Sequence, residues 1–439
     1  MHFKIIQAVL LITLVFNFSG WALSGTGGSP LGGMGTGYVT FNGQKICVSG
    51  TMPPAAANGV EKEVSASGFS FFVNGTAKKQ LKATSEDAKC PLQTADFGTM
   101  ENVKFDLDAF GPYWPGMGKE KYQLATSPLA MFNITAVNNG STDAEVAVTM
   151  EYGTGGSPDG EKAISFGNGK DYLMVDCDGA TPTFSAGGTG SFESDGTLSN
   201  AAGNSVAAKC TVPAGETVNF KFVLSWYRTY DQEGYYYHNF YDNAKDAADF
   251  GMSKFDSTRN SITSFVDRVM GSNFPEWYND RLLNNTYPLV HNSVCAADGR
   301  CAFWEGCYGI IGTIDQGQHA AVFYTFNWPS VQWHELQYWS RQQRSSGQVH
   351  HDFNEGRQNF SPNSTQNNRH LLPWDDKNHA DYWWFPQTET WADLNSMYIF
   401  KAYELVMATG EVDSLKLYWE SIKKSAGAIL AKCKNGSKL

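Results

Sequence analysis

The sequence predicts a protein of the α+β class, with an antiparallel β-sandwich in its first half and helices in its second half. Apolar residues occur at every second position in several segments before residue 240, whereas they recur at helical spacing after residue 241. The chain has 439 residues, of which 42% are hydrophobic and 18% are charged. A chain of this length and composition can bury a substantial core.

Strand signals extend from about Leu23 to Trp226. Residues 65–81, SASGFSFFVNGTAKKQL, contain an Asn74-Gly75 pair that is typical of a two-residue hairpin turn. Glycine- and serine-rich stretches separate the strand segments, which favours antiparallel strands joined by turns. Two further segments alternate clearly, with one face formed by Val146, Val148 and Met150 and another by Val218, Phe220, Phe222, Leu224 and Trp226.

A glycine-rich segment stands near the start of this region. Residues 29–44 read SPLGGMGTGYVTFNGQ, and a dinucleotide-binding fingerprint would require G-x-G-x-x-G followed by a helix. Counting from Gly33 places Tyr38 at the third glycine position, and the residues that follow are β-branched and aromatic. We therefore expect a tight turn and a close backbone approach at the start of a strand, rather than a phosphate-binding loop.

Helical spacing begins after Tyr241, and we expect the second half to be all-α. Asp393 is expected to cap a helix that ends before Gly410, a typical residue just after a helix. The apolar positions that define the other helices are Ile262, Phe265, Val266, Val269 and Met270, and then Leu415, Tyr418, Trp419, Ile422, Ala426 and Ile429.

The first 22 residues have the features of a secretory signal peptide. Lys4 precedes an apolar stretch from Ile5 to Phe16, and Gly20 and Ala22 stand at the small-residue positions of a cleavage site. The apolar stretch is too short to cross a bilayer, and no later segment is apolar and long enough to do so. The sequence therefore predicts a protein that is secreted or resides in the lumen of the secretory pathway.

The eight cysteines and the glycosylation acceptor sites agree with that compartment. An even number of cysteines without a C-x-x-C pair favours disulfides over a zinc site. The pairs that we expect are Cys177 with Cys210 and one pair among Cys295, Cys301 and Cys307, although sequence does not fix the connectivity. The N-x-S/T pattern occurs at Asn74, Asn133, Asn139, Asn284, Asn359, Asn363 and Asn435.

Charge and aromatic content narrow the class of partner. The formal net charge of −11 argues against a nucleic acid or an anionic membrane surface. Aromatic residues make up 14% of the chain, which fits either large apolar cores or stacking on sugar rings. The sequence contains neither a P-loop nor a G-x-S-x-G elbow.

Candidate chemistry is concentrated in residues 301–329, CAFWEGCYGIIGTIDQGQHAAVFYTFNWP. Glu305 lies in an apolar, aromatic setting, and Asp315 and His319 follow it. Burying a carboxylate is costly unless donors compensate it, and such sites are often functional. The alternative is that Glu305 is a surface or capping carboxylate.

A second cluster, RHLLPWDDKNHADYWWFP, covers residues 369–386 and contains Trp374 and Asp375. Aromatic residues interleaved with acids and histidines fit a sugar subsite, and they fit a solvated loop equally well. A metal site at His350-His351-Asp352 is disfavoured, because adjacent side chains do not easily converge on one ion.

The order of these motifs resembles that of glycoside hydrolase family 116, the group that contains bile-acid (non-lysosomal) β-glucosidase, or glucosylceramidase. The similarity extends from about residue 28 to the C-terminus. FWEG matches the nucleophile segment of the family, and the similar segments around it are SPLGGMGTGYV, DAFGPYWPG, LATSPLAMFNITAVNNGSTDAEVAV, FPEWYNDRLLNNTYPLV, TIDQGQHAAVFYTFNWP and WADLNSMYIFKAYELVMATGEVDSLKLYWESIKKS.

The resemblance implies a particular domain organisation. After the signal peptide at residues 1–22, residues 23–240 would form the N-terminal β-sandwich and residues 241–439 the first part of an (α/α)6 catalytic barrel. The family's acid/base aspartate lies beyond residue 439 in this comparison. We therefore expect a chain that is truncated within its catalytic domain and has doubtful activity by itself.

The resemblance also implies retaining hydrolysis of β-glucosides or related β-glycosides, including glycolipids, without a metal or organic cofactor. Glu305 would be the nucleophile and Asp315 a sugar-binding residue. Trp374 and Asp375 stand where the family has a His-Asp pair in the sugar pocket, and His319 stands where it tends to have an aromatic residue. Asp315, His319, Trp374 and Asp375 are therefore the candidate substrate-binding residues.

Two other functions are compatible with these residues. A secreted carbohydrate-binding or interaction protein would keep the pocket without catalysis, and would bind sugar whether or not Glu305 is present. An inverting glycosidase on a related helical toroid would release a product of opposite stereochemistry.

Overall fold

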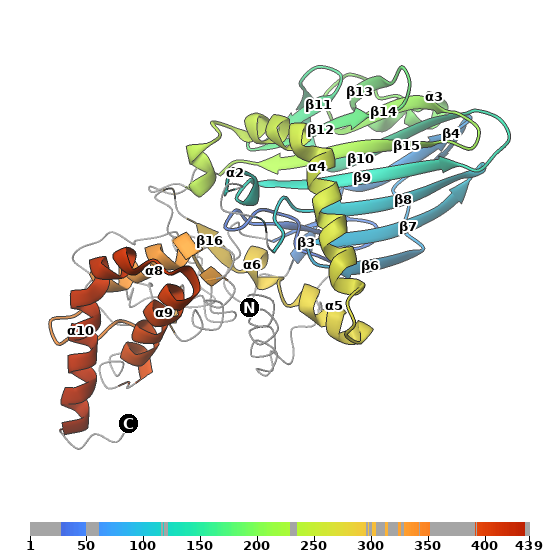
Figure 1. Ribbon diagram of the computed structural model, residues 1–439. Coiled ribbons are helices and arrows are strands. Elements are labelled where there is room, and N and C mark those ends of the chain that lie inside the picture. The colour runs from blue at the N-terminus through green and yellow to red at the C-terminus, as the bar shows by residue number, and fades with distance from the viewer. Residues whose placement is uncertain are drawn as a thin grey trace.

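Most of the strands occupy the N-terminal part of the protein, and three helices form a separate group at its C-terminal end (Figure 1). The computed structural model describes residues 28–49, 61–115, 117, 122–228, 235–295, 297, 301–303, 312–314, 324–325, 329–341, 343–351, 391 and 393–434. The predicted signal peptide lies outside these residues. Among the helices within them, none is both long enough and apolar enough to cross a membrane.

Most of the strands belong to one hydrogen-bonded antiparallel network. In that network β10 is unusually long, and its first part pairs with β4 and β14 whereas its end pairs with β11. The network is thereby divided into a smaller half, β5-β4-β10-β14-β13, and a larger half, β11-β12-β15-β9-β8-β7-β6. The strands are β4 (Gly68–Val73), β5 (Thr76–Lys78), β6 (Ser85–Lys89), β7 (Leu92–Met100), β8 (Val103–Phe110), β9 (Leu129–Asn138), β10 (Ala144–Pro158), β11 (Ala163–Phe166), β12 (Asp171–Cys177), β13 (Thr183–Gly187), β14 (Gly203–Val212) and β15 (Thr217–Trp226).

The two halves face each other across one apolar core. Phe69 of β4 packs edge-on against Phe222 of β15 with ring centroids 5.8 Å apart, and Phe71 lies 4.6 Å from Phe105 of β8. The alternating residues predicted from the sequence fill this core, since both of the alternating sets named above are buried. The mixed α+β class is therefore confirmed. The halves are joined through β10, so they differ from the two separate sheets of a simple β-sandwich.

Two turns match their sequence signals. The hairpin between β4 and β5 places Asn74 and Gly75 at φ 47° and 89°, the left-handed conformation that an Asn-Gly turn requires. The glycine-rich segment leads into β1 (Val39–Phe41). It pairs with β2 (Ile46–Ser49), which pairs in turn with β3 (Glu61–Glu63) to complete a small sheet.

The long helix α4 (Ala244–Met270) crosses the outer face of the larger half (Figure 1). The side chain of Asn243 caps its first turn by accepting a hydrogen bond from the backbone N–H of Asp246. Phe255 packs edge-on against Phe110 of β8, with centroids 5.4 Å apart. The shorter helical elements are α2 (Tyr122–Ala125), η2 (Thr189–Ser191), α3 (Phe192–Asp195), η3 (Tyr236–Asn239), α5 (Glu276–Asn284) and α6 (Pro288–His291).

The C-terminal helices α8 (Pro329–Arg341), α9 (Asp393–Thr409) and α10 (Val412–Lys434) pack on one another. Gly410 follows α9 at φ 74° and donates its N–H to the carbonyl of Val406, as its predicted position required. The sequence predicts Asp393 as the N-cap of this helix. In the structure Asp393 is instead the first helical residue of α9, one position after the N-cap.

The all-α prediction for the second half is wrong at one place. A β-hairpin of β16 (Ser293–Cys295) and β17 (Cys301–Phe303) lies between α6 and α8, and a disulfide joins Cys295 to Cys301. The strands are only three residues long, too short for an alternating pattern to be visible in the sequence. The disulfide confirms the predicted local pair.

The predicted bond between Cys177 and Cys210 is not formed in this structure. The two sulfur atoms nevertheless lie 3.7 Å apart, and both cysteines are buried thiols.

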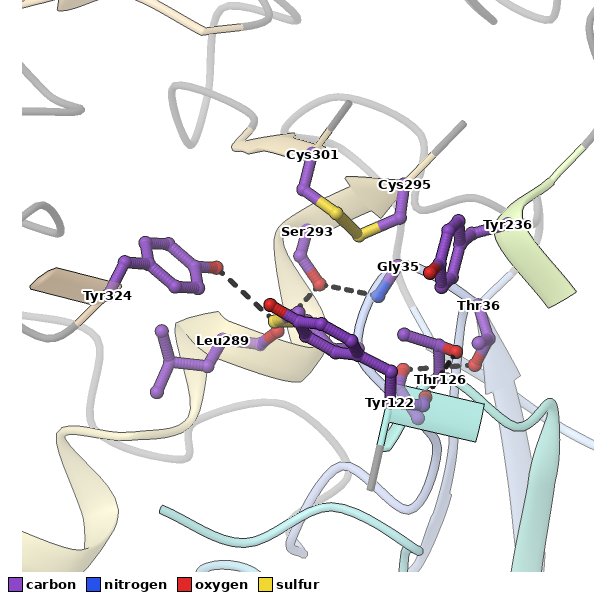
Figure 2. Close-up of a disulfide and its surroundings, with 12 residues drawn as sticks. Gly35, Thr36, Tyr122, Thr126, Tyr236, Leu289, Ser293, Cys295, Cys301 and Tyr324 are labelled. Carbon is purple, nitrogen blue, oxygen red and sulfur yellow. Dashed lines mark hydrogen bonds between the residues drawn. A yellow bond between two sulfur atoms is a disulfide. The ribbon is translucent and has the colours of Figure 1, made fainter. Parts of the chain in front are cut away.

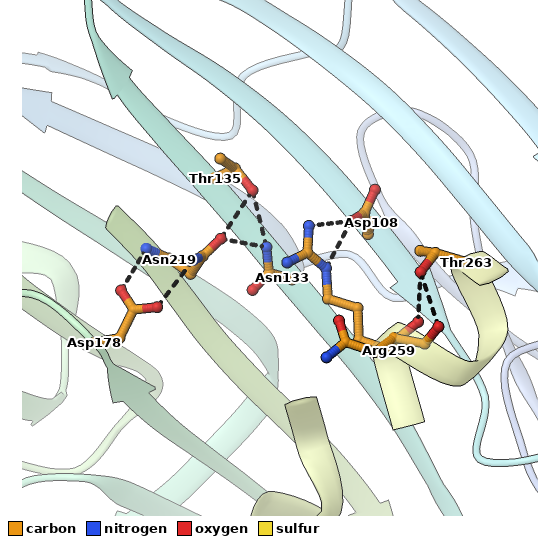
Figure 3. A network of polar contacts seen from close by, with 8 residues as sticks. Asp108, Asn133, Thr135, Asp178, Asn219, Arg259 and Thr263 are labelled. Atoms are coloured by element: carbon orange, nitrogen blue, oxygen red, sulfur yellow. Dashed lines mark hydrogen bonds and ion pairs between the residues drawn. The ribbon is translucent and has the colours of Figure 1, made fainter. Parts of the chain in front are cut away.

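A polar network lies on the outer face of the larger half, beside α4 (Figure 3). The amide of Asn133 donates hydrogen bonds to Thr135 and Asn219, and the Asn133 side chain is fully buried. Asn133 is one of the residues with the N-x-S/T pattern, and its burial leaves its side chain inaccessible to a glycan in the folded protein. The sequence pattern could not show it, because burial depends on the neighbouring strand and helix.

In the same region Arg259 of α4 donates two hydrogen bonds to one carboxylate oxygen of Asp108, at 2.8 and 2.5 Å. Both side chains are mostly buried, so Arg259→Met should leave the Asp108 carboxylate without its partner. We expect a loss of about 1–3 kcal/mol in the free energy of unfolding, measured by urea denaturation. Lys162→Met, which removes a half-exposed ion pair with Asp176, should change stability little. Equal losses for the two variants would contradict this assignment.

Candidate functional site

The five residues predicted to form the site, Glu305, Asp315, His319, Trp374 and Asp375, lie outside the described residues. The segments that lead into the first two are described. Strand β17 ends two residues before Glu305, and residues 312–314 directly precede Asp315. The elements that support these two segments are therefore the described part of the site.

The hairpin before Glu305 is fixed by its own disulfide and by the helix that precedes it. Ser293 of β16 is fully buried, and its hydroxyl donates a 2.6 Å hydrogen bond to the carbonyl of Leu289 in α6. The same oxygen accepts a 2.7 Å hydrogen bond from the backbone N–H of Gly35 (Figure 2). One serine thus connects the hairpin to the glycine-rich segment, 258 residues earlier in the chain.

The glycine-rich segment allows this contact because it has no side chains in the way. A Cβ at Gly35 would lie 2.5 Å from the backbone nitrogen of Cys295, and one at Gly33 would collide with the carbonyl of Ser127. The segment is anchored to the strands by Trp226, whose indole N–H donates to the carbonyl of Thr36 at 2.7 Å. The expectation of a tight turn with close backbone approach is confirmed, and the partner in that approach is the hairpin before Glu305.

Two buried tyrosines lie in the same apolar cluster as the disulfide. The hydroxyl of Tyr324 donates to the sulfur of Met34 at 3.5 Å, which again joins the second half to the glycine-rich segment (Figure 2). Burial raises the pKa of both Tyr113 and Tyr324 well above its ordinary value. Both phenols therefore remain protonated near neutral pH.

The segment before Asp315 is connected to a pair of buried histidines. The backbone N–H of Ile314 donates to the carbonyl of His351 at 2.8 Å, and the His351 ring packs edge-on against Trp391 with centroids 4.8 Å apart. His350 is also buried. Within the described part of the chain, no three His, Cys, Asp or Glu side chains are grouped so that they could hold a metal ion.

Polar side chains of α9 and α10 hold the loop that carries these histidines. Asn395 of α9 accepts from the backbone N–H of Val349 at 3.1 Å and donates to the carbonyl of Gly347 at 2.8 Å. Lys432 of α10 donates to the side-chain oxygen of Gln348 at 2.6 Å. These bonds satisfy the backbone groups of Val349 and Gly347 and the side-chain oxygen of Gln348, and they tie the loop to α9 and α10.

Sequence reasoning missed a buried ion pair between α8 and α9. The ammonium of Lys401 lies 2.6 Å from the carboxylate of Glu335, and these side chains are 1% and 8% exposed. A signal for it was present, because Lys401 follows Leu394 and Tyr398 on the buried stripe of α9. A lysine on an apolar stripe requires an acidic partner, although the sequence alone does not say which one.

The described residues before both candidate segments lie against the group of C-terminal helices. Strand β17 contacts α8, and Ile314 belongs to the apolar cluster formed by α8, α9 and α10.

Comparisons with known proteins do not assign the chain to a family. No family model matches it, and no curated protein matches it. Among solved structures, it is similar to a family GH92 inverting mannosidase from Bacteroides thetaiotaomicron VPI-5482 at 12% identity and a TM-score of 0.35, with 91% of this chain and 60% of that chain covered.

Two further solved structures give similar values. A family GH92 α-mannosidase from Bacteroides thetaiotaomicron in complex with mannoimidazole has 11% identity and a TM-score of 0.35, with 92% of this chain and 61% of that one covered. A human-microbiome protein assigned as a kojibiose phosphorylase has 9% identity and a TM-score of 0.33, with 89% and 53% covered. The chain thus spans little more than half the length of these proteins, and similarities this low assign no function to it.

The contact between the glycine-rich segment and the hairpin gives one prediction. Gly35→Ala should force the hairpin away, because the added Cβ meets the backbone of Cys295 and Gly35 has φ 74°. We expect a lowered melting temperature and faster reduction of the Cys295–Cys301 disulfide by dithiothreitol, measured by alkylation and mass spectrometry. Gly75→Ala is the matched control, since Gly75 also has a positive φ but has no atom within 4 Å of a Cβ. Equal reduction rates in the two variants would contradict the proposed contact.

The ion pair gives another prediction. Lys401→Met leaves the Glu335 carboxylate buried without a partner, so we expect the free energy of unfolding to fall by about 3–5 kcal/mol in chemical denaturation. The double variant Glu335→Met/Lys401→Met should recover most of that loss, because it removes both charges. A double variant as unstable as the single one would show that the charges themselves do not matter.

Proposed function

We propose that the protein is a retaining β-glycosidase that acts on β-glucosides or related β-glycosides, with Glu305 as its nucleophile. The observation that carries the proposal is the FWEG segment at residues 303–306, within an ordered series of segments that resembles glycoside hydrolase family 116. It is supported by the rigid approach to that segment, where a disulfide-closed hairpin packs on the glycine-rich segment and on α8.

In this proposal the Glu305 carboxylate attacks the anomeric carbon of the glycoside and forms a glycosyl ester. A second carboxyl group protonates the departing oxygen and then activates the water that hydrolyses the ester, so the sugar is released with retained configuration. A retaining enzyme holds its two carboxyl groups about 5–5.5 Å apart. No metal or organic cofactor is required for these steps.

The proposed roles of the other residues follow from their chemistry. Asp315 accepts hydrogen bonds from sugar hydroxyls, and Trp374 stacks on the apolar face of a sugar ring. Asp375 and His319 complete the polar lining of the pocket. Helices α8, α9 and α10 would belong to an (α/α)6 barrel that encloses the site, and the protein would act in the secretory pathway or outside the cell.

The nucleophile is tested most directly by trapping the covalent intermediate. An aryl 2-deoxy-2-fluoro-β-glucoside with a dinitrophenolate leaving group reacts without protonation of that group, so the test does not depend on the acid/base residue. We expect mass spectrometry to find one fluoroglucosyl group on the peptide that contains Glu305. Glu305→Gln should abolish this labelling, and it should lower hydrolysis of an aryl β-glucoside by on the order of 10³-fold or more.

Glu420→Gln serves as the matched control, because Glu420 is an exposed carboxylate of α10 that pairs only with Lys423 in the described structure. It should leave labelling unchanged. Labelling of another carboxylate would identify that residue, and not Glu305, as the nucleophile. Saturable sugar binding with no labelling, unaffected by Glu305→Gln, would replace the proposal with a non-catalytic carbohydrate-binding protein. A released sugar of inverted configuration would also overturn it.

A further inference from the structure

We propose that Cys177 and Cys210 form a disulfide that joins the two halves of the strand network when the protein meets a small-molecule disulfide such as oxidised glutathione. This inference is independent of the proposed glycosidase activity. The sulfur atoms lie 3.7 Å apart, and a disulfide between them requires an approach to about 2.05 Å. Both residues stand at the edge of the main core, 8% and 5% exposed.

The two cysteines come from opposite halves of the network. Cys177 is the last residue of β12 in the larger half, where its register partner is Phe220 of β15. Cys210 lies in β14 of the smaller half, opposite Val146 of β10. The halves are also connected by β10, by apolar packing, by residues 213–216 between β14 and β15, and by a 2.9 Å hydrogen bond from the Asn138 amide of β9 to the carbonyl of Val212 in β14. A disulfide here would add a covalent bond directly between the two faces of the core.

Gly179 makes room for this pair of sulfur atoms. A Cβ at that position would lie 2.7 Å from the Cys210 sulfur and 3.1 Å from its Cβ. The backbone N–H of Gly179 also donates to the Cys177 sulfur at 3.4 Å. The turn after β12 therefore has a glycine where a side chain would collide with Cys210, and its backbone contacts the Cys177 sulfur directly.

The contact between the thiols also favours the first chemical step. The hydrogen bond with Cys210 lowers the pKa of Cys177, and that of the Gly179 N–H acts in the same direction. The same contact, followed by burial, raises the pKa of Cys210. Cys177 is therefore the group that ionises first, and the thiolate is the form that attacks a disulfide.

The reaction balances as two thiol–disulfide exchanges. The Cys177 thiolate attacks one sulfur of oxidised glutathione, which forms a mixed disulfide and releases one glutathione thiolate. Cys210 then loses its proton and attacks the Cys177 sulfur of the mixed disulfide, which forms the Cys177–Cys210 bond and releases the second glutathione. The protein loses two electrons and two protons, and one molecule of oxidised glutathione becomes two of the reduced form.

The test is differential alkylation of the full chain after incubation with oxidised glutathione. Free thiols are blocked in denaturant, the disulfides are reduced, and the new thiols are labelled with a second reagent and located by mass spectrometry. We expect the second label on Cys177 and Cys210 together, in addition to Cys295 and Cys301. We also expect oxidation to raise the melting temperature. The difference between the oxidised and the reduced protein should be roughly 5–10 °C larger in the wild type than in Cys177→Ala.

Three variants make the result specific. In Cys177→Ala only the Cys295–Cys301 bond remains as a known disulfide, so the residual melting difference measures that bond. Cys90→Ala removes another buried cysteine and should leave the Cys177–Cys210 bond and its melting difference unchanged. Gly179→Ala should slow formation of the bond by on the order of tenfold, whereas Gly190→Ala, where a Cβ has open space, should not.

The proposal would be overturned if both Cys177 and Cys210 still carried the first label after prolonged oxidation. A bond between either of them and a third cysteine would also overturn it, as would a melting difference that Cys177→Ala does not reduce.

Discussion

The contact between the glycine-rich segment and the β16–β17 hairpin is the constraint on which the rest of the second half depends. The backbone of Gly35 lies directly against Cys295, and Ser293 bonds both to that backbone and to α6. Backbone packed on backbone leaves little freedom for small adjustments, because neither side has a side chain that could rotate away. The hairpin therefore leaves the strand region in a defined direction, and Glu305 follows two residues after it ends.

Beyond the hairpin, polar bonds place the helices with comparable precision. The ion pair of Glu335 and Lys401 fixes how α8 lies on α9, since a buried charge is tolerated only where its partner is within contact. Asn395 and Lys432 hold the loop that contains His350 and His351. Apolar packing alone would stabilise the three helices in several arrangements of similar energy, whereas these directional bonds favour one of them.

Much of the secondary structure could be predicted from the sequence, because its signals are local. Strand alternation, the Asn74-Gly75 turn and the end of α9 at Gly410 each depend on residues a few positions apart, and the structure agrees with all three. The candidate Glu305 was likewise identified from its immediate neighbours and from a resemblance of motifs. It lies outside the described residues, so its role remains a proposal.

The tertiary structure decided what depends on residues far apart in the chain. The sequence alone indicated that the glycines of residues 32–37 allow a close approach, but only the fold shows that Cys295 is the partner. The sequence likewise contains a glycosylation acceptor pattern at Asn133, which the fold buries beside Thr135 and Asn219. Both differences have one physical reason. Periodicity and turn chemistry record which face of an element is apolar, whereas the identity of the group that meets that face is set only when the elements pack.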